Sequence, residues 1–374
     1  MKELHDWFQE NKRDFPWRVE RTPYRVWISE VMLQQTRAAV VIPYFLRWMA
    51  LFPNVKSLAE ASLESVIKAW EGLGYYSRAR NLHAAAKQIS EQFCGEFPFD
   101  RKELETIRGL GPYTIGAILS FGFRKRAAAV DGNTTRVLSR YFCVEENVCK
   151  QATKRKIQEL AENLLDEKEP WVTAEALIEL GATICTPKPR CPDCPLQSNC
   201  SAYRQCKAAL LPIKNQEPET VVLFRAVAII ESEGKILLRK GSPGQVMADL
   251  YEFPYFEMGD EKWGLRKLMR EIKKNWGITV ENCEKLTEVQ HTFTRYKAHL
   301  FPERFQALKP ISEIYRNGLK NREFDEKGLQ NFCSERETIA ERQGSSENKN
   351  FEVNPTKSKT DSSDYFGIDR MNFF

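Results

Sequence analysis

Four cysteines lie within sixteen residues near the middle of the chain, with the spacing C-x5-C-x2-C-x5-C. They are Cys185, Cys191, Cys194 and Cys200. Four thiolates this close along a chain can surround one metal ion or one cluster, and such sets bind structural zinc or a [4Fe–4S] cluster. The spacing disfavours four unliganded thiols but leaves zinc and iron open. No second cysteine pair lies at the separation typical of a zinc ribbon, which favours iron.

Two carboxylates lie in sequence surroundings that could serve chemistry. Glu30 interrupts an apolar segment, 27–33, whereas Asp131 precedes a glycine at the expected start of a helix. Cleavage of a glycosidic bond uses one acid whose surroundings keep it protonated and one ionised carboxylate. Each residue also has a purely structural interpretation. A buried glutamate is usually satisfied by a partner, and an aspartate before a helix is usually its N-cap.

A glycine turn separates two expected helices at residues 107–116, IRGLGPYTIG. Gly109 and Gly111 would let the backbone approach a partner closely, and the N–H groups that begin the next helix can bind a phosphate. Contacts of this kind hold a DNA backbone without reading its sequence. A tight turn between two helices that bind no DNA has the same pattern. The hairpin alone therefore does not show that the protein binds DNA.

The elements that must position these residues are helices through residue 206. Apolar residues recur at helical spacing in 82–93 and 154–165, and a third helical stretch follows Pro23 and extends to Gln34 and Gln35. No segment of this part has a clear strand pattern. The sequence therefore predicts a mostly helical domain, residues 1–206, that carries both carboxylates, the hairpin and the four cysteines.

The composition changes near residue 207. The segment 207–220 has two prolines and little periodicity, which is typical of a linker. The following region, 221–343, combines strand and helix patterns and predicts an α+β domain. The last residues, 344–374, are rich in Ser, Asn, Lys and Asp and predict a disordered tail.

Two strand patterns support the α+β assignment. Residues 221–230 and 235–239 are expected to pair as a β-hairpin around a short turn. Between residues 290 and 301 polar and apolar side chains roughly alternate, which predicts another strand.

Composition and charge bound the class of protein. The 374 residues carry a net charge of +5, which permits nucleic-acid binding without arguing for it. The longest aliphatic runs are five residues, whereas a membrane helix needs roughly 20. The first residues include acids and lack the apolar core of a signal peptide, so we expect a cytoplasmic, bacterial-type protein with no targeting segment. In that reducing compartment the ten cysteines favour metal ligands over disulfides.

Five segments occur together in one order along the chain: VWISEVMLQQT (26–36), GLGYYSRARNLH (72–83), LGPYTIGAI (110–118), AVDGNTTRVL (129–138) and the cysteine loop. This set resembles the adenine DNA glycosylases of the MutY type, in the helix-hairpin-helix glycosylase superfamily. The resemblance is dense over residues 1–206 and thinner beyond them. It implies a helix-hairpin-helix glycosylase fold with an iron–sulfur cluster loop, followed by an α+β domain resembling MutT (Nudix) proteins.

The resemblance also implies roles for individual residues. The target adenine would be flipped out of the duplex into a pocket. Glu30 corresponds to the general acid that protonates adenine N7, and Asp131 to the carboxylate that stabilises the oxocarbenium ion or adds to it as a nucleophile. The remaining implied positions are Tyr113 and Asn133, which support this chemistry, Arg18 and Glu175, which contact adenine, and Gln35, Leu73 and Tyr75, which wedge into the duplex or meet 8-oxoguanine.

Tyr113 distinguishes the chain from relatives that also cleave the DNA strand. Those relatives place a Schiff-base lysine directly before the threonine of the hairpin helix, and here that residue is Tyr113. The resemblance therefore implies a monofunctional glycosylase with water as the nucleophile. Its cofactor would be a [4Fe–4S] cluster on the four cysteines. Its partner would be double-stranded DNA with A opposite 8-oxoguanine or G, bound by a monomer.

The second domain is expected to read the damaged partner base. MutT-like hydrolases bind metal through a REUxEExGU segment, but Lys274 and Asn275 stand at its paired glutamates, so we expect binding without hydrolysis. Two features depart from the family. The first two cluster cysteines are one residue closer than usual, and the loop that reads 8-oxoguanine, usually Phe-Ser-His, is here Phe293, Thr294 and Arg295.

Three other functions are compatible with parts of the pattern. A related glycosylase could act on another mismatched base such as thymine, but Glu30 at the purine-protonating position argues against it. A DNA-damage-binding protein without catalysis is disfavoured because both carboxylates are present. A nucleotide hydrolase is disfavoured by the missing glutamates.

Overall fold

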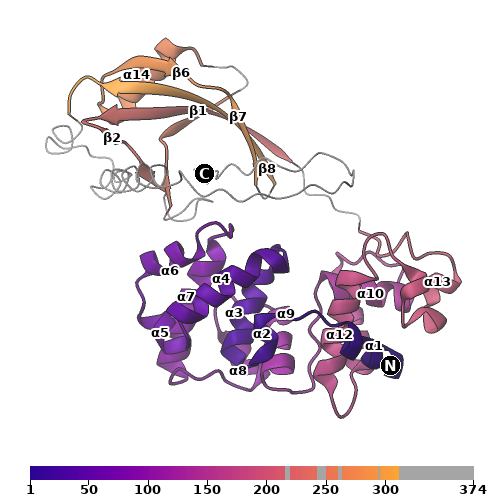
Figure 1. Ribbon diagram of the computed structural model, residues 1–374. Helices are drawn as coiled ribbons and strands as arrows, with labels where there is room; N and C mark the ends of the chain where they lie inside the picture. The colour runs from indigo at the N-terminus through magenta and orange to yellow at the C-terminus, as the bar shows by residue number, and fades with distance from the viewer. Residues whose placement is uncertain (215–219, 242–249, 260–262, 294, 311–374) are drawn as a thin grey trace, which may run out of the picture. The chain divides into compact units, whose positions relative to one another are not determined.

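The computed structural model describes residues 1–214, 220–241, 250–259, 263–293 and 295–310 (Figure 1). The chain divides into two compact units, Met1–Gln216 and Glu217–Phe374. The expected tail, 344–374, and the last part of the expected second domain, 311–343, lie outside the described residues.

The first unit is helical, and no strand occurs in the described residues 1–214, as the sequence predicts. Besides short 3-10 turns, it contains one π-helical turn, η1, at Ile118–Gly122. Its α-helices are α1 Lys2–Asn11, α2 Pro16–Val19, α3 Pro23–Leu33, α4 Ala38–Leu51, α5 Val55–Glu60, α6 Leu63–Trp70, α7 Ser77–Gln92, α8 Arg101–Thr106, α9 Pro112–Ala117, α10 Gly132–Tyr141, α11 Gln151–Leu164, α12 Pro170–Thr183 and α13 Ser201–Arg204.

The helices of this unit form two groups (Figure 1). One group holds α2 to α8 around a core in which Trp27, Trp48 and Trp70 are almost fully buried. The other holds α10, α12 and α13, and α1 packs against α12 even though the whole first group separates them in sequence. The turn η1 contacts both α3 and α12, so it joins the groups. Residues from both groups can therefore meet at one site.

Helical periodicity predicted α11 well. Ile157, Ala161 and Leu165 are buried at one face of this helix, in the core shared with α1, α10 and α12. Burying an aliphatic side chain of this size stabilises the fold by about 1.5–3 kcal/mol. The apolar stripe is thus the face that holds α11 against its neighbours.

The expectation that Gln34 and Gln35 lie in a helix is wrong. Helix α3 ends at Leu33, and Gln35 has a φ of 56°. The carbonyls at the end of α3 accept hydrogen bonds from the buried guanidinium of Arg78, so they do not need further helical partners. A side chain more than forty residues away therefore ends this helix.

The described residues of the second unit form a mixed sheet and one helix, α14. In the six-stranded sheet the order is β2-β1-β8-β6, with β5 also pairing β1 and β7 also pairing β8, and β3 and β4 form a separate pair. The elements are β1 Val221–Ser232, β2 Lys235–Ile236, β3 Arg239–Lys240, β4 Tyr251–Glu252, β5 Tyr255–Met258, α14 Leu265–Trp276, β6 Val280–Lys285, β7 Val289–Phe293 and β8 Tyr296–Ala307.

The long strands β1 and β8 run parallel at the centre of this sheet. Helix α14 buries Leu268, Ile272 and Trp276 against one face, in a core that includes Ala228 and Phe305. Val227, Ala298 and Leu300 form a smaller apolar cluster of their own. The alternation of these side chains along β1 and β8 explains the period-two pattern in the sequence.

Two strand expectations need correction. The segment 235–239 is not one return strand, because β2 pairs with β1 whereas Arg239 belongs to β3 and forms an ion pair of 2.9 Å with Glu252 on β4. The segment 290–301 is not one strand either, since β7 and β8 are antiparallel neighbours in which Phe293 pairs with Tyr296. Alternation continues through a tight turn, so the pattern alone did not reveal the break.

None of the helices in the described parts of the chain has the length and apolar character needed to span a bilayer.

Candidate active site

Glu30 lies in the middle of α3, a helix that begins with Pro23 and is capped by the Thr22 hydroxyl. Its side chain is buried, and Oε2 accepts a hydrogen bond from the hydroxyl of Tyr113. Burial raises the pKa of Glu30 to about 7. The bond from Tyr113 opposes this shift, and the charges of Asp131 and Glu175 add to it. Near neutral pH this carboxyl therefore holds a proton much of the time, as a general acid requires.

Tyr113 reaches Glu30 from α9, which begins with Pro112 directly after the glycine hairpin. Gly109 has a φ of +80°, a conformation that favours glycine. The backbone of the turn therefore explains why a glycine stands at this position. A Cβ on Gly116 would lie 2.3 Å from the carbonyl oxygen of Ala128. This close approach sets α9 against the segment that leads into Asp131.

Asp131 is the N-cap of α10, as the sequence predicts. Its Oδ1 accepts from the Thr134 N–H at 2.7 Å, and its Oδ2 accepts from the Asn133 amide at 2.7 Å. Both oxygens therefore act as acceptors, which suits an ionised carboxylate at the positive end of a helix dipole. The structural and chemical interpretations of Asp131 are compatible, because capping fixes the carboxylate in place.

Asn133 connects Asp131 to the cysteine loop. Its Oδ1 accepts from Arg136 Nη2 at 2.8 Å, and Arg136 Nε donates to the carbonyl of Cys185 at 2.7 Å. Behind Asn133 lies Gly181 of α12, where an added Cβ would stand 2.6 Å from the Asn133 Cβ. Sequence reasoning identified Asn133 but missed Arg136 and Gly181, since neither has a local signal.

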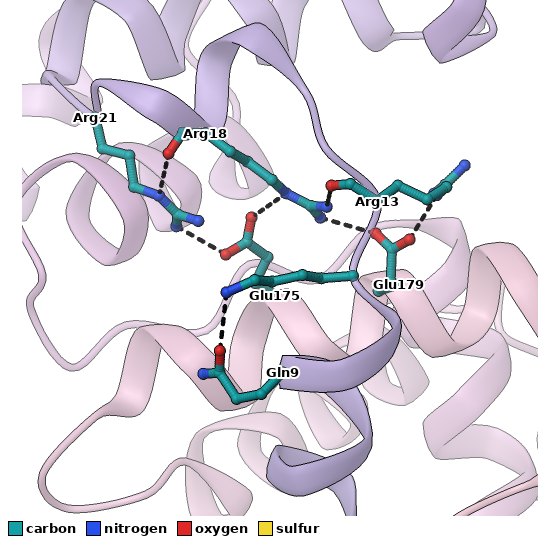
Figure 2. A network of polar contacts seen from close by, with 7 residues as sticks. Gln9, Arg13, Arg18, Arg21, Glu175 and Glu179 are labelled. Atoms are coloured by element: carbon teal, nitrogen blue, oxygen red, sulfur yellow. Dashed lines mark hydrogen bonds and ion pairs between the residues drawn. The ribbon is translucent and has the colours of Figure 1, made fainter.

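Arg18 and Glu175 lie in a buried ionic network (Figure 2). Arg18 Nε donates to Glu175 at 2.7 Å and its Nη2 donates to Glu179 at 2.8 Å. Arg21 donates to the second oxygen of Glu175 at 2.7 Å, and Arg13 donates to Glu179. Burial lowers the pKa of Arg18, but Glu175 and Glu179 outweigh it and raise that pKa. Sequence reasoning missed Glu179, although its spacing of four residues from Glu175 places both on one helix face.

The three residues expected to meet DNA from this unit lie on two loops. Gln35 follows α3, and Leu73 and Tyr75 precede α7. Gln35 and Tyr75 are exposed and have positive φ angles, 56° and 50°, whereas Leu73 is buried. The fold thus brings the three residues together, with Leu73 packed beneath the surface.

The cysteine loop follows α12 and is held by Arg140. Arg140 Nη1 lies 3.4 Å from Cys185 Sγ and donates to the carbonyl of Thr186 at 2.6 Å, and Nη2 donates to Pro187 at 3.1 Å. Burial raises the pKa of the Cys194 thiol to about 11, and the neighbouring cysteines add to the shift. The four thiols therefore lie within electrostatic range of one another.

The thiols of the cysteine loop lie beside cationic side chains. Within the described ranges, no three His, Cys, Asp or Glu side chains form a group that could hold one metal ion. Positive groups beside the thiols, Arg136 and Arg140, suit a site whose ligands carry negative charge.

In the second unit the structure describes two residues of the loop that the sequence predicts to read 8-oxoguanine. Phe293 ends β7 and its ring lies 5.5 Å from that of Tyr296, while Arg295 Nη2 contacts the Tyr296 hydroxyl at 3.3 Å. Thr294 lies outside the described residues. On α14, Asn275 donates to Glu271 at 3.1 Å, and Lys274 is in the last turn.

The chain is similar to known DNA repair proteins. Residues 28–165 match the HhH-GPD superfamily base excision DNA repair proteins. The adenine DNA glycosylase of Buchnera aphidicola is 32% identical over 319 residues, which cover 84% of this chain and 88% of that protein. The mouse adenine DNA glycosylase is 34% identical over 349 residues, covering 79% and 68%. A solved thermostable thymine-DNA glycosylase has a TM-score of 0.51 and 30% identity, and covers 55% of this chain and 95% of its own.

Proposed function

The chain belongs to the adenine DNA glycosylases, base excision repair enzymes that hydrolyse an N-glycosidic bond, and from this we propose that it excises adenine opposite 8-oxoguanine or G. The observation that carries the proposal is the buried pair of Glu30 and Tyr113, whose electrostatic neighbours include Asp131 and Glu175. A buried acid with a raised pKa and a second carboxylate thus lie near each other, which supports glycosidic cleavage by an acid and a carboxylate.

In the proposed mechanism Glu30 transfers its proton to adenine N7. The electrons of the glycosidic bond then leave with the base, which departs as neutral adenine, and an oxocarbenium ion forms on the sugar. Asp131, fixed by Thr134 and Asn133, stabilises that cation or adds to it transiently. Water then bonds to the sugar carbon and, where Asp131 has added, displaces its carboxylate as the bond between them breaks. The water gives up a proton, which returns Glu30 to its acid form. Tyr113 holds the Glu30 carboxyl in position throughout.

Tyr113 also supports a monofunctional reaction. A lysine at this position could attack the sugar and form a Schiff base, which precedes strand cleavage. Tyr113 has no amine, and burial raises its pKa well above the ordinary value. Its hydroxyl therefore keeps its proton and serves as a hydrogen-bond donor rather than a nucleophile.

We propose that Arg18 and Glu175 contact the edge of the flipped adenine. Glu175 lies close enough to raise the pKa of Glu30, so the ionic network borders the catalytic acid. Arg18 and Glu175 are fixed by two neighbouring ion pairs, Arg21–Glu175 and Arg18–Glu179. Groups that are already oriented can bind a flipped base with little further loss of conformational freedom.

We assign a [4Fe–4S] cluster to Cys185, Cys191, Cys194 and Cys200. When bound, the cluster would hold the loop together as a covalent cross-link. Arg136 and Asn133 connect the loop backbone to Asp131, so the loop is placed to support the catalytic carboxylate.

We propose that the hairpin glycines, Gly109 and Gly111, contact the DNA backbone.

We assign recognition of 8-oxoguanine to the second domain, 221–343, joined by the linker 207–220. Its mixed sheet with one helix is compatible with a MutT-like fold. Phe293, Thr294 and Arg295 are the proposed reading residues, and the enzyme is proposed to act as a monomer on double-stranded DNA.

The deciding experiment is single-turnover excision by Glu30→Gln. Glutamine can still accept the bond from Tyr113 but has no proton to give, so the rate constant on A opposite 8-oxoguanine should fall by about 10²–10⁴-fold. Binding of the same duplex should persist and serves as the control. A variant rate within about threefold of wild type lies outside that range and would exclude Glu30 as the acid. A parallel duplex with T opposite G tests the thymine substrate named for the solved relative.

A further inference from the structure

Arg78 is a buried cation in the first turn of α7. Its side chain lies between the end of α3 and the loop before α7, with the guanidinium 5.2 Å from the ring centre of Trp70. Among the described residues no carboxylate forms an ion pair with it, and its Nε has no hydrogen-bond partner. Burial lowers the pKa of Arg78 to about 10.

The guanidinium is bound instead by the backbone of two loops. Nη1 donates to three carbonyls at the end of α3, at 2.7 to 3.0 Å, and Nη2 donates to two carbonyls before α7, both at 3.2 Å, and to one hydroxyl. The acceptors are Val31, Met32 and Gln34 for Nη1, and Leu73, Gly74 and the Thr36 hydroxyl for Nη2. One side chain therefore joins two segments that are about forty residues apart.

Burying a charge without a counter-ion is unfavourable, and the hydrogen bonds from Arg78 to five carbonyls and one hydroxyl offset that cost. All of these bonds can form together only when both loops hold this arrangement, so the buried guanidinium fixes their geometry. Each of the two joined segments contains one residue with a strained backbone: Gln35 in the first and Tyr75 in the second have positive φ angles. Residues other than glycine keep that conformation only where their surroundings hold it.

We propose that Arg78 is a positioning residue that locks the Gln35 loop and the Leu73–Tyr75 loop into one rigid surface before DNA binds. The inference rests on the proposed function, in which Gln35, Leu73 and Tyr75 meet the duplex. A preformed surface would spare the enzyme the cost of ordering two loops during base flipping. Lysine cannot replace Arg78, because a single ammonium group cannot reach both sets of carbonyls with the fixed fork of a guanidinium.

Amide hydrogen exchange in the DNA-free protein tests the locking directly. The amides of Thr36 and Leu73 bond to the carbonyls of Leu33 and Trp70, at 3.2 and 3.1 Å, and report on the two loops. In wild type both should be protected from exchange. In Arg78→Lys both should exchange about tenfold faster or more, the effect of losing a hydrogen bond to a charged group. Amides of α11 should not change.

Two results would overturn the proposal: unprotected loop amides in wild type, or unchanged loop exchange in folded Arg78→Lys. The wild-type measurement needs no variant, so it decides even if the variant does not fold. Excision should fall about tenfold or more in Arg78→Lys, whereas Arg126→Lys should retain it. Arg126 is the matched control, because it also donates to backbone carbonyls, those of Glu162, Leu165 and Asp166. If wild type excises no adenine, the proposed function fails while the exchange data still decide the locking.

Discussion

Gly181→Ala offers a quantitative test of how the fold positions Asp131, the proposed catalytic carboxylate. An ideal Cβ at Gly181 would lie 2.6 Å from the Asn133 Cβ and 3.0 Å from its Cα and carbonyl carbon. Since two of these contacts are backbone atoms, they cannot be relieved by rotating a flexible side chain. The first turn of α10 must shift, and with it the Asn133 amide that bonds to Asp131 at 2.7 Å.

The expected effect on stability is small. Overpacking costs about 1–3 kcal/mol, while exchanging glycine for alanine inside α12 returns about 1 kcal/mol of helix propensity. The net loss in the free energy of unfolding should therefore be about 0–2 kcal/mol. The effect on catalysis should be large, because a displacement on the order of 1 Å in a catalytic group costs about 10²-fold in rate.

Thermal unfolding and single-turnover excision of adenine opposite 8-oxoguanine separate the two effects. Gly132→Ala is the matched control, since Gly132 begins α10 and an added Cβ there meets nothing within 4 Å. We expect this control to keep wild-type excision. A Gly181→Ala protein that excises adenine within about threefold of wild type, far from the loss expected for displacement, would refute the claim that the Gly181–Asn133 contact positions Asp131.

Four further predictions concern Glu30, the second domain and the cysteine loop. The excision rate constant should be highest below pH 7 and fall as the pH rises through about 7, because Glu30 loses its proton there; a pH–rate profile flat from 6 to 9 would contradict this. Folding raises the pKa of Glu30 from its ordinary value of 4.5 to about 7, so the wild-type protein should lose stability as the pH rises between these two values. Unfolding measurements should therefore find Glu30→Gln more stabilising at pH 8 than at pH 4.5. Truncation after about residue 215 should leave excision opposite G intact and reduce the preference for 8-oxoguanine by about 5- to 150-fold; an unchanged preference would assign recognition to Gln35, Leu73 and Tyr75. Iron analysis should find a [4Fe–4S] cluster in wild type and its loss in Cys191→Ser, whereas stoichiometric zinc in wild type would exclude the cluster.

Short local patterns in the sequence determine several helix boundaries and one buried helix face of this protein. The start of α3 follows from Thr22 and Pro23, the cap of α10 from Asp131, and the buried face of α11 from its apolar spacing. Each depends on neighbours within one or two helical turns, so the local chain contains the whole signal. The same holds for the cysteine loop, whose four cysteines lie within sixteen residues.

Contacts between distant segments could be decided only by the tertiary structure. The sequence does not reveal that Tyr113 donates to Glu30 across 83 positions, or that Arg18 meets Glu175 across 157. It also misplaced Gln35 in a helix, because the carbonyls that end α3 are bound by Arg78 from another helix. Helix propensity is a local preference of tenths of a kcal/mol per residue, and a buried guanidinium bonded to several carbonyls outweighs it. The residues were readable from the sequence, but the raised pKa of Glu30 arises from burial and from charges that only folding brings near.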